Sequence, residues 1–246
     1  MSAWVALMKK DFKLTRTVFL VGLVMNVLIA MLTIYLGTIA ENTLLTFIPL
    51  VLAVVLHVIY VPIVVFTSLK TEANQLHIWL HNPQPASRLM LSKIVNGLIM
   101  MVISLLMLYV TTGLLIIPKF NLIETYWTDT RLSGLFIFPH ILMISIMIGV
   151  WVMFLWSLYH WLKFKIGRWN WIVVIGAVII PAWVAALFES SNLYRLATNW
   201  GGITYNFSSF SIDPIQTYAG EYLYNFIFII GLFFLTAWII DNKVEV

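Results

Sequence analysis

The chain has 246 residues, of which 62% are hydrophobic and only 10% are charged, and its mean hydropathy is +0.98. Soluble domains carry about 25% charged residues, and a water-soluble fold of this size could not remove so much apolar surface from water. The composition therefore excludes soluble enzymes, nucleic-acid-binding domains and disordered tails, and it indicates an integral membrane protein. The net charge of +4 comes from basic residues at the ends of apolar runs, which is typical of membrane topology rather than of nucleic-acid binding.

Residues 1–16 have the pattern of an amphipathic helix that lies at the membrane surface. Large apolar side chains recur near helical spacing and lysines fall opposite them, as Trp4, Leu7, Met8 and Phe12 against Lys9, Lys10 and Lys13. The alternative is a basic anchor that only orients the first span. The apolar run that follows is about 24 residues long, which exceeds the 7–15 residues of a signal-peptide core, so we expect it to be retained as a span.

Six apolar stretches are long enough to cross the hydrocarbon core, which takes about 20 helical residues. They cover residues 17–40, 44–69, 89–117, 134–162, 171–188 and 221–240. The sequence therefore predicts an all-α polytopic membrane protein, with one six-span domain over residues 17–246.

The distribution of lysine and arginine predicts the orientation. With six spans, all but three of the 14 basic residues fall on one side of the membrane, and the exceptions are Lys119, Arg131 and Arg195. Cytoplasmic loops carry the excess of basic residues, so we expect both termini to be cytoplasmic.

The connection between the second and third predicted spans, residues 70–88, has a helical pattern of its own. Apolar residues recur on one helical face at Leu69, Ala73, Leu76 and Leu80. The prolines in the stretch 82–85 then end the helix, because each removes a backbone donor and restricts the residue before it. A short helix held between two spans could pass force to a cytosolic partner, and an ordinary structured loop is the alternative.

The longest polar connection, residues 189–220, mixes Asn, Gly and Ser with aromatic residues. Such a mixture suits a pair of short re-entrant or surface-lying helices, which we expect to cap the outer mouth of the protein.

The chain lacks the common motifs of catalysis and nucleotide binding. Gly-Lys occurs nowhere, which excludes a P-loop, and the absence of cysteine excludes disulfides and thiolate metal sites. His77 and His81 have the spacing of two metal ligands, but no third ligand is near them in the sequence, so no metal site is expected. The acidic residues fall at span ends or in loops, which disfavours proton-coupled and ion transport and favours an amphipathic or lipid-like substrate.

Some residues inside the spans are expected to hold helices together rather than to bind substrate. Asn26, Asn96 and Asn225 are interpreted as interhelical hydrogen-bonding residues, and Gly37, Gly97 and Gly113 as sites of close helix packing.

The layout of the whole chain and one local stretch resemble the ABC-2 type transporter permeases. The stretch Leu80-His81-Asn82-Pro83-Gln84-Pro85-Ala86-Ser87-Arg88, followed by Lys93, is similar to the L-x-x-x-P-x-S-R…K pattern that leads from the family's coupling helix into the third span. Within the family, the chain is similar to small half-permeases of Gram-positive bacteria, including those that export amphipathic toxin peptides. Its outer segment before the sixth span is longer and more polar than the family's short re-entrant helices.

The resemblance implies a bacterial plasma-membrane permease that pairs with a second half, identical or related, and carries one cytosolic P-loop ATPase subunit under each half. ATP and Mg²⁺ would be bound by that ATPase, and this chain would hold no cofactor and no catalytic residue. Residues 71–82 would dock in the ATPase as a coupling helix, with contacts from Glu72, Gln75, Leu76, His77, Trp79 and Leu80. Residues 1–16 would form an elbow helix, with Trp4, Lys9, Lys10 and Phe12 among its characteristic residues.

Two alternatives belong to other functional classes. One is a non-transporting immunity or sensor protein that binds a peptide toxin in the membrane. The other is an intramembrane enzyme, which the absence of polar residues paired in the sequence disfavours. A neighbouring gene for a P-loop ATPase would favour the transporter over both.

Overall fold

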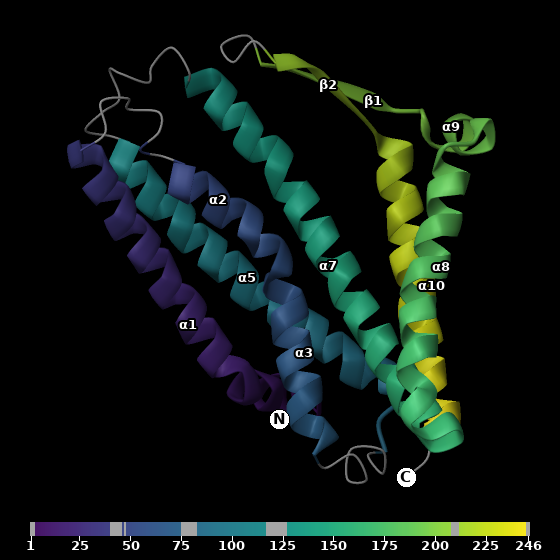
Figure 1. The fold of residues 1–246 in the computed structure, drawn as a ribbon. Helices are drawn as coiled ribbons and strands as arrows, with labels where there is room; N and C mark the ends of the chain where they lie inside the picture. Colours follow the sequence, from purple (N-terminus) through teal and green to yellow (C-terminus); the bar gives the residue numbers. More distant parts are fainter. Residues whose placement is uncertain are drawn as a thin grey trace. The chain divides into compact units, whose positions relative to one another are not determined.

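The computed structural model describes residues 3–39, 46, 48–74, 83–116, 127–207 and 212–244 (Figure 1). The chain divides into two compact units. Unit 1 comprises Met1–Asn74 and Leu91–Gly149, and unit 2 comprises Gln75–Met90 and Val150–Val246. The chain therefore passes from one unit to the other three times. One passage follows Asn74, and the other two lie inside two different long helices, after Met90 and after Gly149.

Six helices in the described part of the chain are long and apolar enough to cross a membrane. They are Ala3–Ile39, Ile48–Ala73, Ala86–Leu115, Gly134–Lys163, Gly167–Glu189 and Ala219–Lys243. This confirms a helical multi-pass membrane protein. The predicted spans agree with these helices within a few residues, as is normal for helix ends, except that the first helix begins at Ala3.

The first helix, α1, runs without interruption over Ala3–Ile39. The expected elbow helix of residues 1–16 and the first span are thus one helix, and no break separates them at residue 16. The buried residues of α1 share one face and are mostly polar, being Leu7, Asp11, Thr15, Asn26 and Thr33. Because lipid is as apolar as leucine, helices in a membrane gain little by hiding apolar residues, and their contacts use polar and small side chains instead.

The second spanning helix of unit 1 is built from three pieces. It consists of α2 (Ile48–Leu56), a 3₁₀ turn (His57–Ile59) and α3 (Tyr60–Ala73). Pro62 accounts for the irregular turn, because proline has no N–H to donate to the carbonyl of Val58 four residues earlier. The helix α1 packs against both α2 and α3 (Figure 1).

Close helix packing in unit 1 centres on Val61, which is fully buried. A Cβ atom added at Gly97 of α5 (Ala86–Ile116) would lie 3.4 Å from Val61 Cγ1, and one added at Gly149 of α7 (Trp127–Ile166) would lie 3.1 Å from the same atom. The predicted packing role of Gly97 is confirmed. Gly113 has open space around it, so its predicted packing role is wrong for the described residues, whereas Gly149 is a packing glycine that the sequence argument missed.

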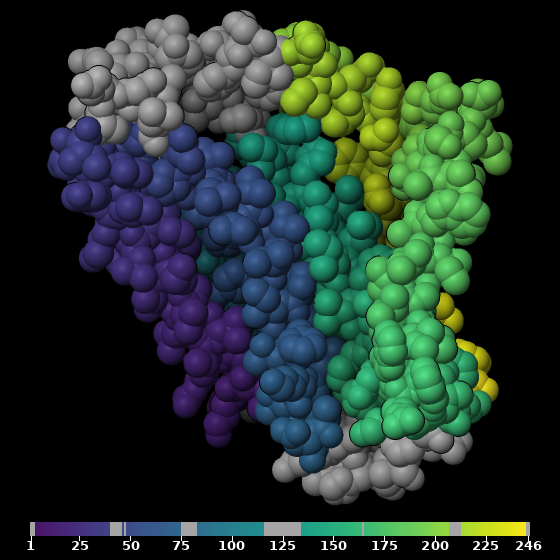
Figure 2. Space-filling view, viewed as in Figure 1, coloured from purple at the N-terminus to yellow at the C-terminus, as the bar shows by residue number. Residues whose placement is uncertain are grey.

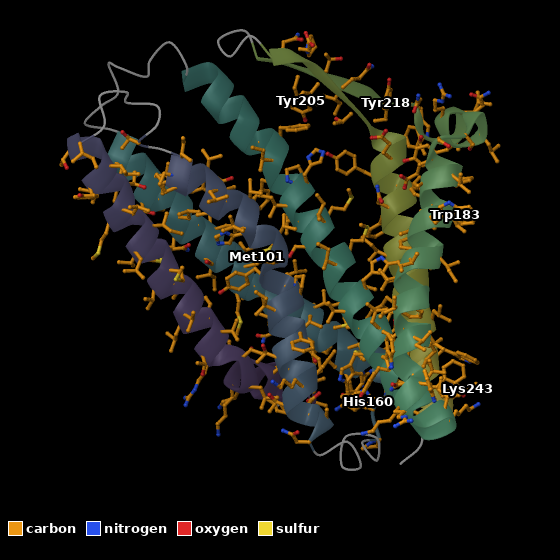
Figure 3. All side chains as sticks on the ribbon, in the orientation of Figure 1. Met101, His160, Trp183, Tyr205, Tyr218 and Lys243 are labelled. Carbon is orange, nitrogen blue, oxygen red and sulfur yellow. The ribbon has the colours of Figure 1, made fainter. Side chains whose placement is uncertain are left out.

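In unit 2, α8 (Asn170–Glu189) is followed by a short helix α9 (Asn192–Thr198) and a β-hairpin of β1 (Gly202–Phe207) and β2 (Ile212–Tyr218). The strands are antiparallel, with Gly202 opposite Tyr218. Tyr205 and Tyr218 are labelled on this hairpin in Figure 3. The expectation of two short helices in residues 189–220 is therefore met only by α9, because residues 202–218 are rich in the β-branched and aromatic residues that favour strands.

The hairpin leads directly into α10 (Ala219–Lys243), where the backbone passes very close to α9. A Cβ atom at Gly220 would lie only 2.2 Å from the carbonyl oxygen of Thr198, and the Gly220 N–H donates to the carbonyl of Trp200 at 3.4 Å. Only glycine fits this junction. Rings from the three helices also meet there, in contacts among Phe188, Tyr194 and Tyr224.

Candidate functional site

Four charged side chains of unit 1 form a closed ring at the end of α1 that lies near the N-terminus. Asp11 and Lys10 come from α1, Glu72 from the last turns of α3, and Lys93 from α5. The Lys93 ammonium lies 3.1 Å from Asp11 Oδ1 and 2.7 Å from Glu72 Oε2. Lys10 closes the ring by pairing with Glu72 Oε1 and, at 3.9 Å, with Asp11 Oδ1.

Hydroxyl and amide groups complete the surroundings of this charge ring. Ser92 donates to the second oxygen of Asp11, and Lys93 donates to Ser68 Oγ at 3.0 Å. One turn further along α1, Asn96 Nδ2 donates to Thr15 Oγ1 at 3.0 Å. The bond from Asn96 confirms its predicted interhelical role.

The ring is electrically neutral and almost enclosed. The side chains of Asp11 and Lys93 are 0% exposed and that of Glu72 is 9% exposed, whereas Lys10 is 43% exposed and forms the outer edge. A buried ammonium or carboxylate is tolerated only when it is paired and hydrogen-bonded, because the protein does not replace the lost hydration otherwise. Two carboxylates and two ammonium groups meet that condition, so the ring fastens α1, α3 and α5 together.

The sequence argument missed this ring because it placed every acidic residue at a span end or in a loop. Asp11 was assigned to the membrane surface, within residues 1–16, although it lies on the inner face of α1. The usable signal was the recurrence of the polar residues Asp11, Thr15, Asn26 and Thr33 on one face of this long helix.

The predicted site residues fall in three different places. Glu72 belongs to the charge ring, and both of its carboxylate oxygens face lysines of the same chain. The other predicted coupling residues, Gln75, Leu76, His77, Trp79 and Leu80, lie outside the described residues. Of the predicted elbow residues, Lys10 belongs to the ring, while Lys9 and Phe12 are exposed and Trp4 is half-buried on α1.

A second polar group, without charge, lies deeper in unit 1. His57 Nδ1 donates to the carbonyl of Ala53 at 2.7 Å, so the other ring nitrogen, Nε2, is left to accept from Ser104 Oγ at 3.0 Å. Asn26 Nδ2 in turn donates to Ser104 Oγ and to the Ser104 carbonyl, each at 3.0 Å. The ring of Tyr60 stacks on that of His57 with centroids 5.7 Å apart. These bonds tie α1, the 3₁₀ turn and α5, and they confirm the predicted interhelical role of Asn26.

A serine bonded to a histidine is the first requirement of a serine nucleophile, so the pair bears on the enzyme alternative. Ser104 is 0% exposed, and its oxygen already accepts from Asn26 and donates to His57. The hydroxyl is thus committed in both directions to neighbouring helices, although Ser104 is among the residues that line a groove of about 400 Å³ between α1 and the second spanning helix. We therefore interpret the pair as an interhelical hydrogen bond. Within the described ranges, no three His, Asp or Glu side chains gather as a metal site.

The two ends of the connection between Glu72 and Ala86 are fastened in different units. On the unit 1 side, Glu72 is held in the charge ring. On the unit 2 side, α5 begins at Ala86, whose backbone N–H donates to Asp241 Oδ1 of α10 at 3.0 Å, and the Pro85 carbonyl accepts from the N–H of Arg88 at 3.0 Å. The connection that the sequence singled out is thus anchored by a polar contact at each end.

No family model, curated protein or solved structure matches this chain.

Proposed function

We propose that this chain is the membrane-spanning permease subunit of an ATP-binding cassette exporter in a bacterial plasma membrane, with both termini in the cytoplasm. It moves amphipathic peptides or lipid-like molecules outward, and a separate P-loop ATPase supplies the energy. A second permease half, identical or related, completes the pathway.

The observation that supports this proposal most is the anchoring of the connection between α3 and α5. Its first end is tied to α1 and α5 of unit 1 through Glu72, and its second end is tied to α10 of unit 2 through Ala86 and Asp241. A partner that pushes on this connection therefore acts on two compact bodies at once. Rigid-body motion of helices about such fixed points is a common way to turn a local push into a change of access.

The pairing of the buried charges in unit 1 supports an amphipathic or lipid-like substrate rather than an ion. The buried charges of unit 1 are paired within the ring and are not left to bind an ion. A transported ion needs binding groups that are not already satisfied within the protein.

A non-transporting immunity or sensor protein remains the alternative function. Such a protein would bind a peptide toxin without an ATPase, and the anchored connection would then serve only to hold the fold.

The test is co-purification of the chain with the P-loop ATPase encoded beside it, followed by ATPase measurements in lipid nanodiscs. We expect a stable complex whose ATP hydrolysis rises several-fold when amphipathic peptides are added. An ATPase that neither binds the chain nor responds to it would overturn the exporter proposal and favour the immunity or sensor protein.

Substitutions in residues 71–82 separate the coupling contact from the anchor. Replacing His77 and Trp79 with alanine should abolish stimulation of the ATPase while the protein inserts and folds normally, because these residues were predicted to contact the partner. Replacing the exposed Lys70, which directly precedes this segment in α3, with alanine serves as the control. If the His77/Trp79 double variant keeps full stimulation, these two residues do not form the coupling contact.

A further inference from the structure

The spanning helices of unit 2 share one end at which basic residues gather. The helices α7 and α10 run towards this end and α8 runs away from it (Figure 1). The opposite ends of α8 and α10 meet at α9, where the rings of Phe188 and Tyr224 are in contact. The turn between α7 and α8 therefore lies at the same end as the last turn of α10. His160 and Lys243, labelled in Figure 3, mark this end on α7 and α10.

Four elements of unit 2 contribute cations to this end. The start of α5 lies there because the N–H of Ala86 donates to Asp241 of α10. Among the described residues of unit 2, Asp241 is the one carboxylate at this end, because the other acidic residues fall beside α9 and the hairpin. The cations are exposed side chains of α5, α7, the 3₁₀ turn Gly167–Trp169 and α10, which we call the cation cluster: Arg88, Lys163, Lys165, Arg168 and Lys243.

The cation cluster is not neutralised by the described part of the chain. The ion pairs of the described residues belong to the charge ring of unit 1, where Lys10 and Lys93 each face two carboxylates. Like charges that gather without partners raise the local positive potential, so an anion bound among them is attracted by several charges at once. The charge ring fastens helices, whereas the cation cluster is a surface for an anionic partner.

The turn that carries three of these cations, from Lys163 to Arg168, has a defined shape. Gly167 has a φ of 58°, a conformation that side chains rarely adopt. Across the turn, Asn170 Nδ2 at the start of α8 donates to the carbonyl of Tyr159 in α7 at 3.3 Å. The three cations are therefore displayed on a fixed backbone.

Tryptophans place the cluster at the depth of lipid headgroups. Lys165 Nζ lies 5.2 Å from the centroid of the Trp161 ring, and Lys243 Nζ lies 5.2 Å from that of Trp238. In the turn itself, Trp169 is 58% exposed. Tryptophan rings concentrate at the boundary between hydrocarbon and water, and a cation held on such a ring by cation–π attraction stays at that depth.

The helix that follows the turn offers a surface for acyl chains. None of the residues in the most apolar stretch of α8 is buried, and the exposed side chains include Ile172, Ile175 and Ile179. Figure 2 shows α8, in green, at the visible surface from one end of the helix to the other. An apolar helix surface and a cluster of cations thus adjoin at the headgroup boundary.

Charge and depth together select the partner. A phosphate of an anionic phospholipid carries the required charge, lies at the depth of tryptophan rings and brings acyl chains for the apolar helix beside it. A zwitterionic lipid carries a cation of its own, which the cluster repels. An acidic protein approaches from the water, and cations that lie on tryptophan rings are poorly placed to meet it.

We propose that the cation cluster binds the headgroups of anionic phospholipids, such as phosphatidylglycerol, in preference to those of zwitterionic lipids. The lysines and arginines donate hydrogen bonds to phosphate oxygens, and the acyl chains lie along α8. This proposal does not depend on transport, because it concerns the lipid that the purified chain retains.

The first test measures lysine reactivity in the unmodified full chain. Phosphatidylglycerol is added to the protein in detergent, exposed lysines are acetylated, and mass spectrometry quantifies each site. We expect acetylation of Lys163, Lys165 and Lys243 to fall about threefold relative to that of Lys70, an exposed lysine of unit 1. Phosphatidylcholine with the same acyl chains should leave the ratio unchanged. Equal ratios with both lipids would overturn the proposal.

A triple variant tests whether the charges themselves select the lipid. Lys163→Gln/Lys165→Gln/Arg168→Gln should lower the preference for phosphatidylglycerol over phosphatidylcholine about tenfold, because three of the five cations are lost. Native mass spectrometry of the protein with each lipid measures the preference. Lys163→Arg/Lys165→Arg keeps the charge and should keep the preference.

The matched control removes the same charge from exposed positions of α1. Lys9→Gln/Lys13→Gln/Arg16→Gln should leave the lipid preference unchanged. Equal losses in the two triple variants would overturn the proposal, since binding would then follow the net charge of the protein. Protection of the cluster lysines by a P-loop ATPase but not by phosphatidylglycerol would overturn it as well, and would identify the cluster as a protein contact.

Discussion

Three asparagines with the same predicted role have different surroundings in the structure. Asn26 donates to Ser104 of α5 and Asn96 donates to Thr15 of α1, so both join two helices. Asn225 instead donates to the carbonyl of Glu221 in its own helix, at 2.9 Å. Residue type alone predicted interhelical bonding for all three, but the partner depends on which face of the helix meets a neighbour, and a single sequence position does not contain that information.

Loss of an interhelical hydrogen bond should be measurable against that internal control. Asn26→Ala should lower the free energy of unfolding by about 1 kcal/mol, since side-chain hydrogen bonds between membrane helices contribute about 0.6 kcal/mol on average and up to about 1.7. Asn225→Ala should change the free energy of unfolding by only a few tenths of about 1 kcal/mol, because it breaks no bond between helices. Unfolding in mixed micelles with increasing SDS measures both. Equal losses for the two variants would contradict the assignment.

The charge ring makes a stronger prediction at the residue scale. Lys93→Met leaves Asp11 and Glu72 enclosed beside Lys10 alone, and removal of one partner of a buried ion pair typically costs about 3–5 kcal/mol. The double variant Lys93→Met/Asp11→Leu removes one charge of each sign and should lose less stability than Lys93→Met.

The same unfolding measurement in mixed micelles compares these variants with Lys70→Met, at an exposed lysine of α3. We expect the Lys70 variant to keep the stability of the unmodified protein. A double variant less stable than Lys93→Met would mean that Asp11 contributes something other than its charge.

At the scale of elements, the junction between α9 and α10 depends on one glycine. Gly220 and Gly231 both lie in α10. A Cβ atom added at Gly220 would overlap the carbonyl oxygen of Thr198, whereas a Cβ atom added at Gly231 would have no described atom within 4 Å. The difference follows from the hairpin, which returns the chain to the end of α9.

Gly220→Ala should therefore displace α9 or the hairpin and lower the free energy of unfolding by about 2 kcal/mol, in the range of overpacked sites. Gly231→Ala should leave it unchanged or slightly higher, because alanine favours helix over glycine. Thermal unfolding in detergent measures the difference, and protease cleavage within residues 192–218 reports the local change. If both variants behave alike, the close approach at Gly220 does not exist in the membrane.

The elements themselves could be predicted unevenly from the sequence. The six spanning helices were predicted correctly because length and hydropathy act locally, over about 20 residues. The hairpin was missed because strand pairing joins Gly202 to Tyr218 across sixteen residues, and the aromatic and glycine-rich stretch was interpreted as helical. The 3₁₀ turn at His57–Ile59 is explained by Pro62, which the sequence does contain, although the hydropathy of the span conceals the break.

At the scale of the whole molecule, the candidate site could be predicted only in part. Glu72 and Lys10 were named from the sequence, but for contacts outside the chain, whereas the structure pairs them with each other. Asp11 and Lys93 are separated by 82 positions, and no local pattern joins residues so far apart. The groove beside α1 depends on how three helices pack and could not be foreseen.

The predicted orientation can be tested on the whole molecule, because the chain has no native cysteine. A single cysteine at Leu196, on α9, should react with a membrane-impermeant maleimide in intact cells. A single cysteine at Asn74 should react only after the membrane is permeabilised, since the distribution of basic residues predicts that this end is cytoplasmic. Both positions are exposed, so accessibility within the protein does not limit the reaction. The reverse labelling pattern would mean that both termini lie outside the cell.

The charge ring also sets an order for the assembly of the protein during synthesis. Asp11 emerges from the ribosome 82 residues before Lys93, so α1 enters the membrane with a carboxylate whose deeply buried partner does not yet exist. A chain that stops after α3 holds Asp11, Lys10 and Glu72 with one positive charge too few. Unpaired charges of this kind are costly in lipid. The ring is thus completed only when α5 arrives, so its buried charges are fully paired only after the first three spans have all been inserted.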